Sequence, residues 1–522
     1  MLFNSFPFIF GFLPLALIVF YGVSRVSRRT GQAALALLSL GFYAWWRPSQ
    51  LWILLVSILF NYFLGRRIQV DRAAGRLELV RSIMWVGVAA DLAMLVYFKY
   101  LLFIVDNVSS VFEARIDHGT ILLPLGISFF TFQKIAYLVD SARGDAEKTS
   151  FLDFSLFAAF FPQLIAGPIV HYKEVIPQFH APSFGRLQAR NLLIGLVIVA
   201  NGLFKKTVLA DSIGGYLDPL MLAAARHGHV DLLTGWTIAV SFTFQVYFDF
   251  SGYSDIAIGL ARMLGILLPL NFHSPLRAAS IIDYWRRWHM TLQRFILTYL
   301  FQPLSLPFNR LASRLRLEGW AAFAVGIGIP TFVTFFVLGI WHGAGWTFVV
   351  FGLLQAVYTC SNEAWRERRK RRRRAARRAG LTVGPPNFAA RATYHVLTIV
   401  CVLVANTMFR AVTVSDGARL WSGMAGLGGV AREPAYAALS SPLLYALLAL
   451  SAGIVFLMPN TQQLLGAFRP AINWGLWRSE DRAPLPWRWR PTPAGLGFTS
   501  IALCLGIIFI QKSEAIFIYF NF

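Results

Sequence analysis

The segment Thr331-Phe-Val-Thr-Phe-Phe-Val-Leu-Gly-Ile-Trp-His342-Gly-Ala-Gly-Trp346 places a histidine at the end of a long apolar run. An ionisable side chain at membrane depth is costly, and it usually has a function there. Small residues follow the histidine, which leaves room for a substrate to approach. A hydrogen bond between helices is the alternative explanation of a lone intramembrane histidine. The segment therefore predicts a membrane protein with a buried site at His342.

The composition supports this prediction. Of the 522 residues, 57% are hydrophobic and only 14% are charged, which is too little polar surface for a water-soluble globule of this size. Apolar stretches long enough to cross a hydrocarbon core of about 30 Å recur along the chain. We expect an all-α, polytopic membrane protein with roughly 10 to 13 transmembrane or re-entrant helices. We treat residues 1–522 as one membrane-embedded domain with its best-supported core at 120–360.

The formal net charge of +23 does not predict nucleic-acid binding, because most basic residues lie between apolar runs, as in cytoplasmic loops. The first span, about 6–23, is followed by three arginines at 25–29, which predicts an amino terminus outside the cytoplasm. The basic stretch 364–390 predicts a cytoplasmic loop that contacts anionic lipids, with an acidic carrier protein as the alternative. The three cysteines show no spacing that predicts a disulfide or a metal site.

A second histidine, His289, ends the segment Tyr284-Trp-Arg-Arg-Trp-His289. On a helical wheel of 3.6 residues per turn, the segment 281–299 has one apolar face and one face of arginines. We expect one continuous amphipathic helix at the cytoplasmic interface. His289 then lies at the edge of the apolar stripe, where it can face the protein interior. An interfacial histidine without chemistry is the alternative.

Other segments combine apolar runs with residues that break a helix or carry charge. We expect separate spans at about 83–98 and 101–112. Proline and glycine interrupt the apolar segments 123–133 and 160–169, which indicates a cavity or a re-entrant segment, or else polar contacts between helices. The segment 248–259 carries Asp249 and Asp255. These acids need partners; they either orient a histidine or arginine, or form a structural hydrogen-bond network.

Five blocks of sequence resemble the membrane-bound O-acyltransferase family, most closely its bacterial alginate O-acetyltransferase branch. In chain order they are Leu123-Pro-Leu-Gly-Ile-Ser-Phe-Phe-Thr-Phe-Gln133, Gln163-Leu-Ile-Ala-Gly-Pro168, Phe248-Asp-Phe-Ser-Gly-Tyr-Ser-Asp-Ile-Ala-Ile-Gly259, Tyr284-Trp-Arg-Arg-Trp-His289 and Trp341-His-Gly-Ala-Gly-Trp346. The resemblance implies a many-helix bundle around a central tunnel, in a locally thinned membrane. It also implies transfer of an acyl group, with acetyl favoured, from a cytoplasmic thioester to hydroxyls of an exopolysaccharide such as alginate.

By this resemblance, His342 and His289 are the catalytic positions. We expect His342 to act as general base on the acceptor hydroxyl, and His289 to position the donor or polarise its carbonyl. The sequence leaves open which histidine is the base. Arg286 and Arg287 are candidates to steer a phosphopantetheine donor. The full set of candidate substrate-binding residues is Trp285, Arg286, Arg287, Asp249, Ser251, Tyr253, Asp255, Gln163 and Trp341.

The resemblance implies no metal and no tightly bound cofactor; acetyl-CoA or an acyl-carrier thioester is the expected donor substrate. We expect a multi-pass protein of the cell inner membrane, in contact with membrane lipids and with a periplasmic acetyltransferase or another polysaccharide-modifying partner. Where the branch commonly has a Gly-Gly-Asn turn, this chain has Ser305-Leu-Pro-Phe-Asn309, so a loop there is the expected place of divergence. A D-alanyl transferase for teichoic acid and a non-catalytic transporter of acyl groups or polysaccharide are the alternatives.

Overall fold

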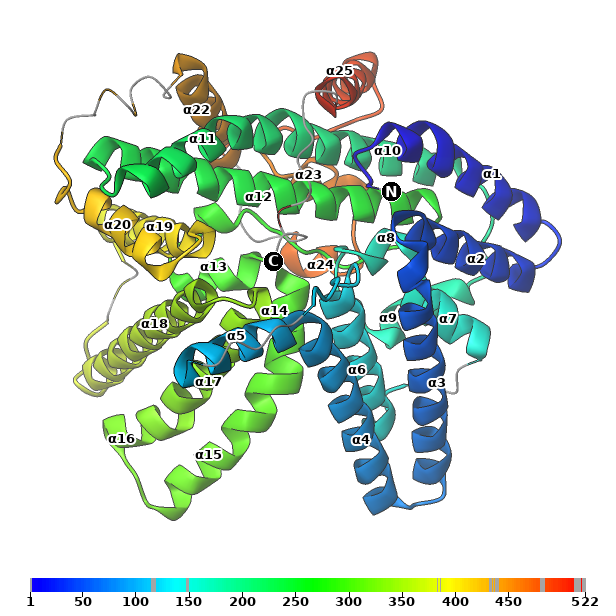
Figure 1. The fold of residues 1–522 in the computed structure, drawn as a ribbon, viewed down its shortest axis with the longest axis horizontal. Helices are drawn as coiled ribbons and strands as arrows, with labels where there is room; N and C mark the ends of the chain where they lie inside the picture. The colour runs from blue at the N-terminus through cyan, green and yellow to red at the C-terminus, as the bar shows by residue number, and fades with distance from the viewer. Residues whose placement is uncertain are drawn as a thin grey trace.

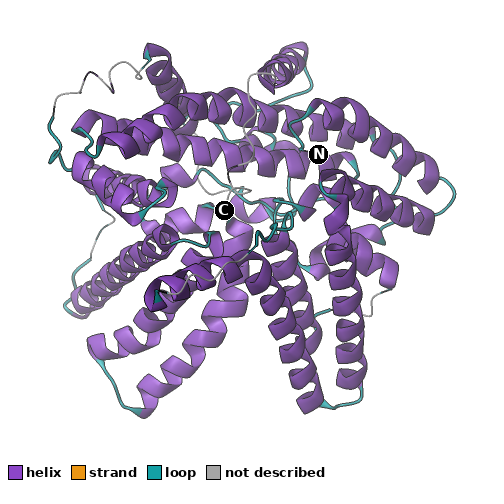
Figure 2. Cartoon of the chain, viewed as in Figure 1, coloured by secondary structure: helices purple, strands orange, loops and turns teal. Residues whose placement is uncertain are grey.

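A computed structural model describes most of the chain as helices. It describes residues 2–113, 119–146, 150–382, 384, 386–430, 434, 436, 441–478, 484–510 and 518. Within these residues the regular structure is helical and no strand occurs (Figure 2), which confirms the all-α prediction.

The first half of the chain consists of helices that differ widely in length (Figure 1). Its α-helices are α1 (Leu13–Ser24), α2 (Arg28–Trp46), α3 (Leu51–Ala73), α4 (Leu77–Leu95), α5 (Leu101–Phe112), α6 (Ile127–Arg143), α7 (Phe151–Ala159), α8 (Phe161–Leu164), α9 (Tyr172–Phe179), α10 (Ala189–Leu203), α11 (Asp211–His227) and α12 (Leu232–Met263).

The second half continues with α13 (Ile281–Arg287), α14 (Met290–Ile296), α15 (Gln302–Arg314), α16 (Gly319–Phe323), α17 (Ile329–His342), α18 (Trp346–Arg378), α19 (Phe388–Arg410), α20 (Val414–Met424), α22 (Pro442–Leu457), α23 (Thr461–Leu464), α24 (Trp474–Trp477) and α25 (Pro493–Ile510). Segments of π-helix join several of these helices without a break. They are Pro7–Phe12, Val96–Tyr100, Phe204–Ala210, Leu297–Phe301 and Ala324–Gly328.

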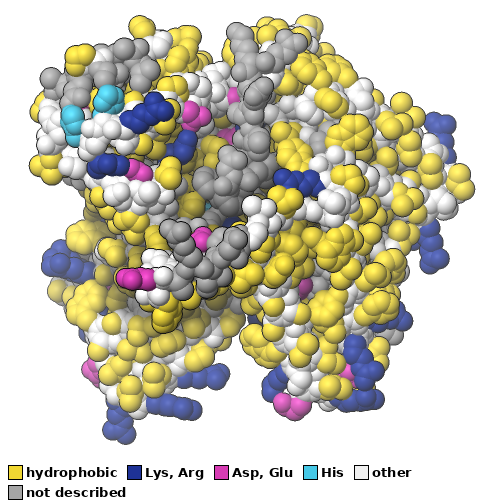
Figure 3. All heavy atoms as spheres, viewed as in Figure 1, with side chains coloured by type: hydrophobic (Ala, Val, Ile, Leu, Met, Phe, Trp, Pro, Cys, Tyr) yellow, Lys and Arg dark blue, Asp and Glu magenta, His cyan; other side chains and the backbone are white. Residues whose placement is uncertain are grey.

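Seven helices in the described residues are long and apolar enough to cross a membrane, and shorter apolar helices accompany them. In Figure 3, hydrophobic side chains cover most of the visible face, while Lys and Arg gather at its lower edge and side margins. The protein is therefore a multi-pass membrane protein. The seven long helices are Pro7–Ser24, Pro48–Ala73, Leu77–Phe112, Ala189–His227, Gly319–His342, Phe388–Arg410 and Pro493–Ile510.

The long helix α12 forms the centre of the fold, with α10 and α11 packed beside it (Figure 1). Most of its residues are buried. A Cβ atom on Gly252 would lie 2.8 Å from the carbonyl oxygen of Gly202, and one on Gly259 would lie 2.7 Å from that of Gly195. Glycine at both crossing points lets the backbones of α10 and α12 approach closely, as is typical of helices packed in membranes.

Several boundaries differ from the sequence predictions. The expected spans 83–98 and 101–112 are parts of one helix, Leu77–Phe112, because the π-helical segment Val96–Tyr100 joins α4 to α5 with no loop between them. The basic stretch 364–390 is not a loop throughout, since α18 continues to Arg378. Arginine and lysine favour helix, and ion pairs such as Arg371 to Glu367, at 2.9 Å, add to this.

Two further predictions of backbone conformation are wrong. The residues Ser305–Asn309 lie within α15 rather than in a loop, and Asn309 Nδ2 donates to the carbonyl of Ser305 over one helical turn, at 2.8 Å. The segment 281–299 is not one continuous helix, because it breaks between α13 and α14. That break is at His289, and its cause is described with the site.

Candidate active site

His342 is the last residue of α17, and the kinked helix α4–α5 holds this helix end in place. The last carbonyls of a helix have no partner within the helix itself. Here Lys99 Nζ donates to the carbonyl oxygens of Trp341 and His342, at 2.6 and 3.3 Å. The hydroxyl of Tyr100 donates to the carbonyl of Ile340, at 3.0 Å. Three consecutive carbonyls of α17 thus gain partners from two consecutive residues of the π-helical segment.

The imidazole of His342 lies among aromatic rings from three helices and is 5% exposed. Its centroid is 5.0 Å from that of Trp341, 5.7 Å from that of Phe351 on α18 and 5.1 Å from that of Phe409 on α19. The histidine also lines a small cavity of about 20 Å³. The polar residues of that cavity include Gln355 and Asn406.

His289 occupies the break between α13 and α14, and it is only 1% exposed. Its φ angle is 44°, in the left-handed region that side chains other than glycine seldom adopt. The loop after α12 stabilises this conformation, because the backbone N–H of Met290 donates to the carbonyl of Asn271 at 2.9 Å. The break turns the imidazole into the protein, whereas a continuous helix over 281–299 would leave it near the interface. A backbone strained in this way is often found at a functional site.

The ring of His289 is enclosed by aromatic side chains and oriented by one amide. Its centroid lies 4.6 Å from that of Phe250 and 6.3 Å from that of Trp341. Its Nδ1 lies 3.0 Å from Oδ1 of Asn271. Complete burial lowers the pKa of His289 to about 3, so its imidazole is neutral near pH 7.

Two cavities meet at Trp285. One is the small cavity of His342, and the other has a volume of about 200 Å³ and is lined by His289. The indole Nε1 of Trp285 donates to Gln355 Oε1 on α18, at 3.2 Å, which fixes the ring between the two cavities. The larger cavity extends along α14, α17 and α18 to Glu363. The arrangement therefore offers two buried imidazoles, each lining a cavity that Trp285 also lines.

Comparison with known proteins identifies the family of this chain. A model of the membrane-bound O-acyltransferase family matches residues 42–404. The chain belongs to this family. It is 35% identical over 459 residues to the peptidoglycan O-acetyltransferase of Helicobacter pylori, covering 82% of this chain and 81% of that protein. It is also 35% identical over 379 residues to the probable alginate O-acetylase AlgI of Azotobacter vinelandii, covering 70% of this chain and 69% of that protein.

A more distant similarity extends to the teichoic acid D-alanyltransferase of Streptococcus thermophilus, which is 26% identical over 289 residues, 55% of this chain and 68% of that protein. Membership of the family makes this protein an O-acyltransferase. Its two histidines and the cavities at Trp285 are the candidate active site of that enzyme.

The acidic candidates lie elsewhere on α12. Asp249 forms an ion pair with Lys206 at 2.6 Å, and Asp255 forms one with Lys205, also at 2.6 Å. Tyr253 stacks on Phe3 with 4.9 Å between ring centroids, and Ser251 is buried on the same helix. The structure does not bring these four residues to the histidines, and their role in substrate binding stays a prediction.

The other predicted residues fall into two groups. Trp285 and Trp341 lie at the histidines, as described above. Arg286 is exposed and lies over the ring of Trp477, 5.1 Å from its centroid, while Arg287 pairs with Asp283 at 3.0 Å. Gln163 is buried in α8, where its Nε2 donates to the carbonyl of Phe157 at 2.7 Å.

Sequence analysis missed three residues that hold the histidines: Lys99, Tyr100 and Asn271. Lys99 had a usable signal, since a lysine inside an apolar run is costly and suggests a function. Asn271 had none, because its role depends on a loop that returns to α14 after the long helix α12.

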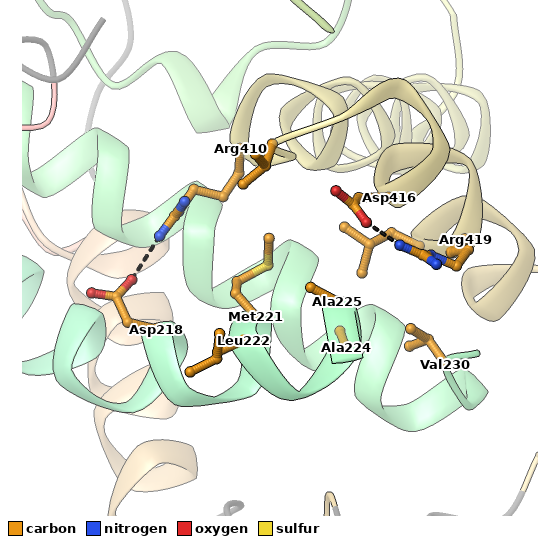
Figure 4. A pocket seen from close by; sticks show the side chains of 11 residues that line it. Asp218, Met221, Leu222, Ala224, Ala225, Val230, Arg410, Asp416 and Arg419 are labelled. Carbon is orange, nitrogen blue, oxygen red and sulfur yellow. Dashed lines mark hydrogen bonds and ion pairs between the residues drawn. The ribbon is translucent and has the colours of Figure 1, made fainter. Parts of the chain in front are cut away.

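A third cavity, of about 210 Å³, lies between α11 and the corner of α19 and α20 (Figure 4). Its floor is apolar, with Met221 and Leu222 on α11. Two ion pairs flank it, Asp218 with Arg410 at 2.7 Å and Asp416 with Arg419. Its described lining residues differ from those of both histidine cavities. The family assignment gives this cavity no role in the transfer.

Proposed function

We propose that this enzyme transfers an acetyl group from a cytoplasmic thioester to a hydroxyl group of a cell-envelope polysaccharide. The observation that carries the proposal is the pair of buried histidines at Trp285, each lining a cavity. The relatives that share 35% identity are named as O-acetyl-transferring proteins, which favours acetyl over other acyl groups.

The chemistry requires the hydroxyl oxygen to attack the thioester carbonyl while its proton moves to a base. A neutral imidazole can accept this proton and return it to the departing thiolate. The proton thus passes from the hydroxyl oxygen to nitrogen and then to sulfur, while a C–O bond forms and the C–S bond breaks. The second imidazole can hydrogen-bond the carbonyl oxygen as negative charge develops on it. Aromatic rings around both histidines keep water from competing for the acyl group.

The donor enters from the cytoplasmic side in this proposal. The larger cavity reaches Glu363 on α18, and basic residues begin one turn further along the same helix, at Arg366. Phosphate groups of acetyl-CoA or of an acyl-carrier thioester would lie near these charges. The positive-inside rule favours an amino terminus outside the cytoplasm, and location in the inner membrane is part of the same proposal.

The acceptor is an exopolysaccharide such as alginate in this proposal, and a periplasmic acetyltransferase or other polysaccharide-modifying protein is the expected partner. A peptidoglycan acceptor is the alternative supported by the similarity to the Helicobacter pylori protein. Teichoic acid D-alanylation has weaker support, since the relevant relative matches only 55% of this chain.

The test uses the purified full chain in liposomes with labelled acetyl-CoA or labelled acetyl-carrier protein outside. Alginate and peptidoglycan fragments, each with and without a periplasmic acetyltransferase, are the acceptors. We expect thiol release together with labelled ester on one of these polymers. D-alanyl-carrier protein serves as the competing donor. Preference for D-alanine would contradict the acetyl assignment. Label carried across the membrane as intact thioester, without thiol release, would contradict acyl transfer itself.

A further inference from the structure

Asn271 holds the polar groups around His289 through both ends of its amide. Its Oδ1 lies 2.9 Å from Thr291 Oγ1 and 3.3 Å from the backbone nitrogen of Thr291, and it faces Nδ1 of His289. Its Nδ2 donates to Ser254 Oγ on α12, at 2.9 Å. The side chain of Asn271 is completely buried, so these contacts fix its orientation without water.

These contacts decide where the proton of the His289 imidazole lies. A backbone N–H can only donate, so the amide atom that faces Thr291 must be the oxygen. The same oxygen faces Nδ1 of His289, and because a carbonyl oxygen can only accept, Nδ1 must carry the proton. In a neutral imidazole the other nitrogen is then unprotonated. That nitrogen, Nε2, makes no hydrogen bond within the described part of the chain.

The two histidines also differ in the volume of the cavity that each one lines. His289 lines a cavity of about 200 Å³, whereas the cavity at His342 measures about 20 Å³. On this measure one water molecule needs about 10–15 Å³, so the cavity at His342 has room for about one water, whereas the cavity at His289 has room for a larger group. Buried polar atoms normally have partners, and the open Nε2 of His289 is an acceptor without one in a site with room for a substrate.

We infer that Asn271 is a positioning residue that keeps the proton on Nδ1 of His289 and leaves Nε2 to accept the proton of the acceptor hydroxyl. His289, rather than His342, is then the general base of the transfer. This inference rests on the proposed function and goes beyond it by assigning the base. When Nε2 takes the proton, the bond from Nδ1–H to Asn271 Oδ1 stabilises the imidazolium, as an asparagine does beside the histidine of papain-like proteases.

The acceptor hydroxyl, the thioester and His289 account for every bond and proton of the transfer. The hydroxyl proton moves to Nε2 as the oxygen forms a bond to the thioester carbon, and the C–S bond then breaks. The sulfur leaves as thiolate and takes the proton back from Nε2. His342 is the other histidine of the site, and the rings packed on His289 are those of Phe129, Phe250, Phe272 and Trp341.

The first experiment compares three variants of the full-length enzyme in liposomes. Asn271→Leu removes the acceptor, and we expect kcat to fall about 10²–10³-fold, within the usual range for a proton transfer, with little change in KM for the thioester. Asn271→Asp keeps an acceptor oxygen and should restore kcat to within about tenfold of the wild type. Asn309→Leu makes the same change at an exposed asparagine of α15 that lines neither histidine cavity, and it is the matched control, with activity near that of the wild type.

The pH profile separates this role from a purely structural one. A carboxylate beside Nδ1 favours the imidazolium, so Asn271→Asp should shift the acid limb of kcat/KM to higher pH. An unshifted limb would overturn the assignment of His289 as base. Equal losses of kcat in Asn271→Leu and Asn309→Leu would overturn the positioning role.

A second experiment does not depend on activity. In protein labelled with ¹⁵N-histidine, the signals of His289 are identified by their loss in His289→Gln. We expect a protonated Nδ1 and an unprotonated Nε2. The opposite tautomer would overturn the inference even if acetyl transfer is observed. The expected tautomer in a protein that transfers no acetyl would mean that the proposed function is wrong, and not the structure around Asn271.

Discussion

The helix α12 borders two buried polar regions, which differ in whether their polar groups have partners. On one side, Asp249 and Asp255 pair with Lys206 and Lys205, and their remaining oxygens also have partners; Gln462 Nε2, for example, donates to Asp255 at 2.7 Å. On the other side, Phe250 packs against His289, whose Nε2 has no hydrogen bond among the described residues.

The difference shows two roles of buried polar residues: some stabilise the fold, and others stay available to react with a substrate. A buried charge is tolerated when a partner compensates it, and a region whose charges are compensated has little capacity left to bind a substrate. A neutral nitrogen left open beside a cavity costs stability and gains from a substrate that donates a hydrogen bond to it. The two regions have the same sequence pattern, because each consists of polar residues within apolar runs. Seven substitutions in and around the two regions test whether they differ in this way.

The largest effect is expected on activity at the histidines. His289→Ala and His342→Ala should each lower kcat by about 10²–10⁴-fold, the usual contribution of a positioned acid or base. The fold should survive, because a neutral side chain is removed and no buried charge is left without a partner. Thiol release measures the activity, and size-exclusion chromatography with a thermal melt measures the fold. Near-normal transfer in both variants would place the chemistry elsewhere.

The second effect is expected on stability at the lysine–aspartate network. Lys206 bridges Asp211 at 2.7 Å and Asp249 at 2.6 Å, all three being buried. Lys206→Met removes the ammonium that pairs with both carboxylates and should destabilise the fold by about 3–5 kcal/mol.

Lys205→Met is the matched control. Asp255 keeps its bonds from Thr461 and Gln462, so a smaller loss of stability is expected. A thermal melt in detergent compares the two variants. A folded Lys206→Met protein that has lost only activity would assign this region to the site and remove the contrast.

A smaller effect is expected where α17 is held from outside the cavities. Lys99→Met removes the ammonium that caps Trp341 and His342. A hydrogen bond to a charged group contributes about 1.5–3 kcal/mol, so we expect a loss of roughly tenfold in kcat through displacement of His342. Lys99→Arg retains charge and donors and should recover part of the rate. Equal activity of both variants and the wild type would show that the helix end is held without Lys99.

The smallest effect is expected at the cavity of Figure 4, beside α11. The side chain of Asp218 is 61% exposed in its pair with Arg410, and an exposed pair contributes about 1 kcal/mol or less. Arg410→Ala should therefore leave both the melting temperature and acetyl transfer nearly unchanged. A large loss of transfer would mean that this cavity takes part in the reaction.

The sequence was sufficient for the fold class and for the burial of His342 at the end of an apolar helix. Long apolar runs predict membrane helices directly, and a histidine at the end of one of them is unusual enough to mark a site. Trp285 and Trp341 could be named because they neighbour the histidines in the chain.

The rest depended on tertiary structure. The wheel for 281–299 describes amphipathicity well, yet it cannot show that a loop 18 residues upstream breaks the helix at His289 through Asn271. In the same way, nothing local distinguishes an aspartate paired to a lysine on a neighbouring helix from one that faces a substrate. Lys205 and Lys206 follow an apolar run, where lysines commonly reach lipid headgroups, so the sequence does not reveal that they pair with aspartates.

A structure of the full chain with a non-hydrolysable acetyl-thioester analogue tests the central claim most directly. The account predicts the acetyl carbonyl in the cavity beside Trp285, with the reacting carbon close to Nε2 of His289 and room for a hydroxyl between them. The pantetheine arm should run along α18 toward its basic end. An acetyl group bound instead at Asp249 and Asp255, on the opposite side of α12, would contradict the account.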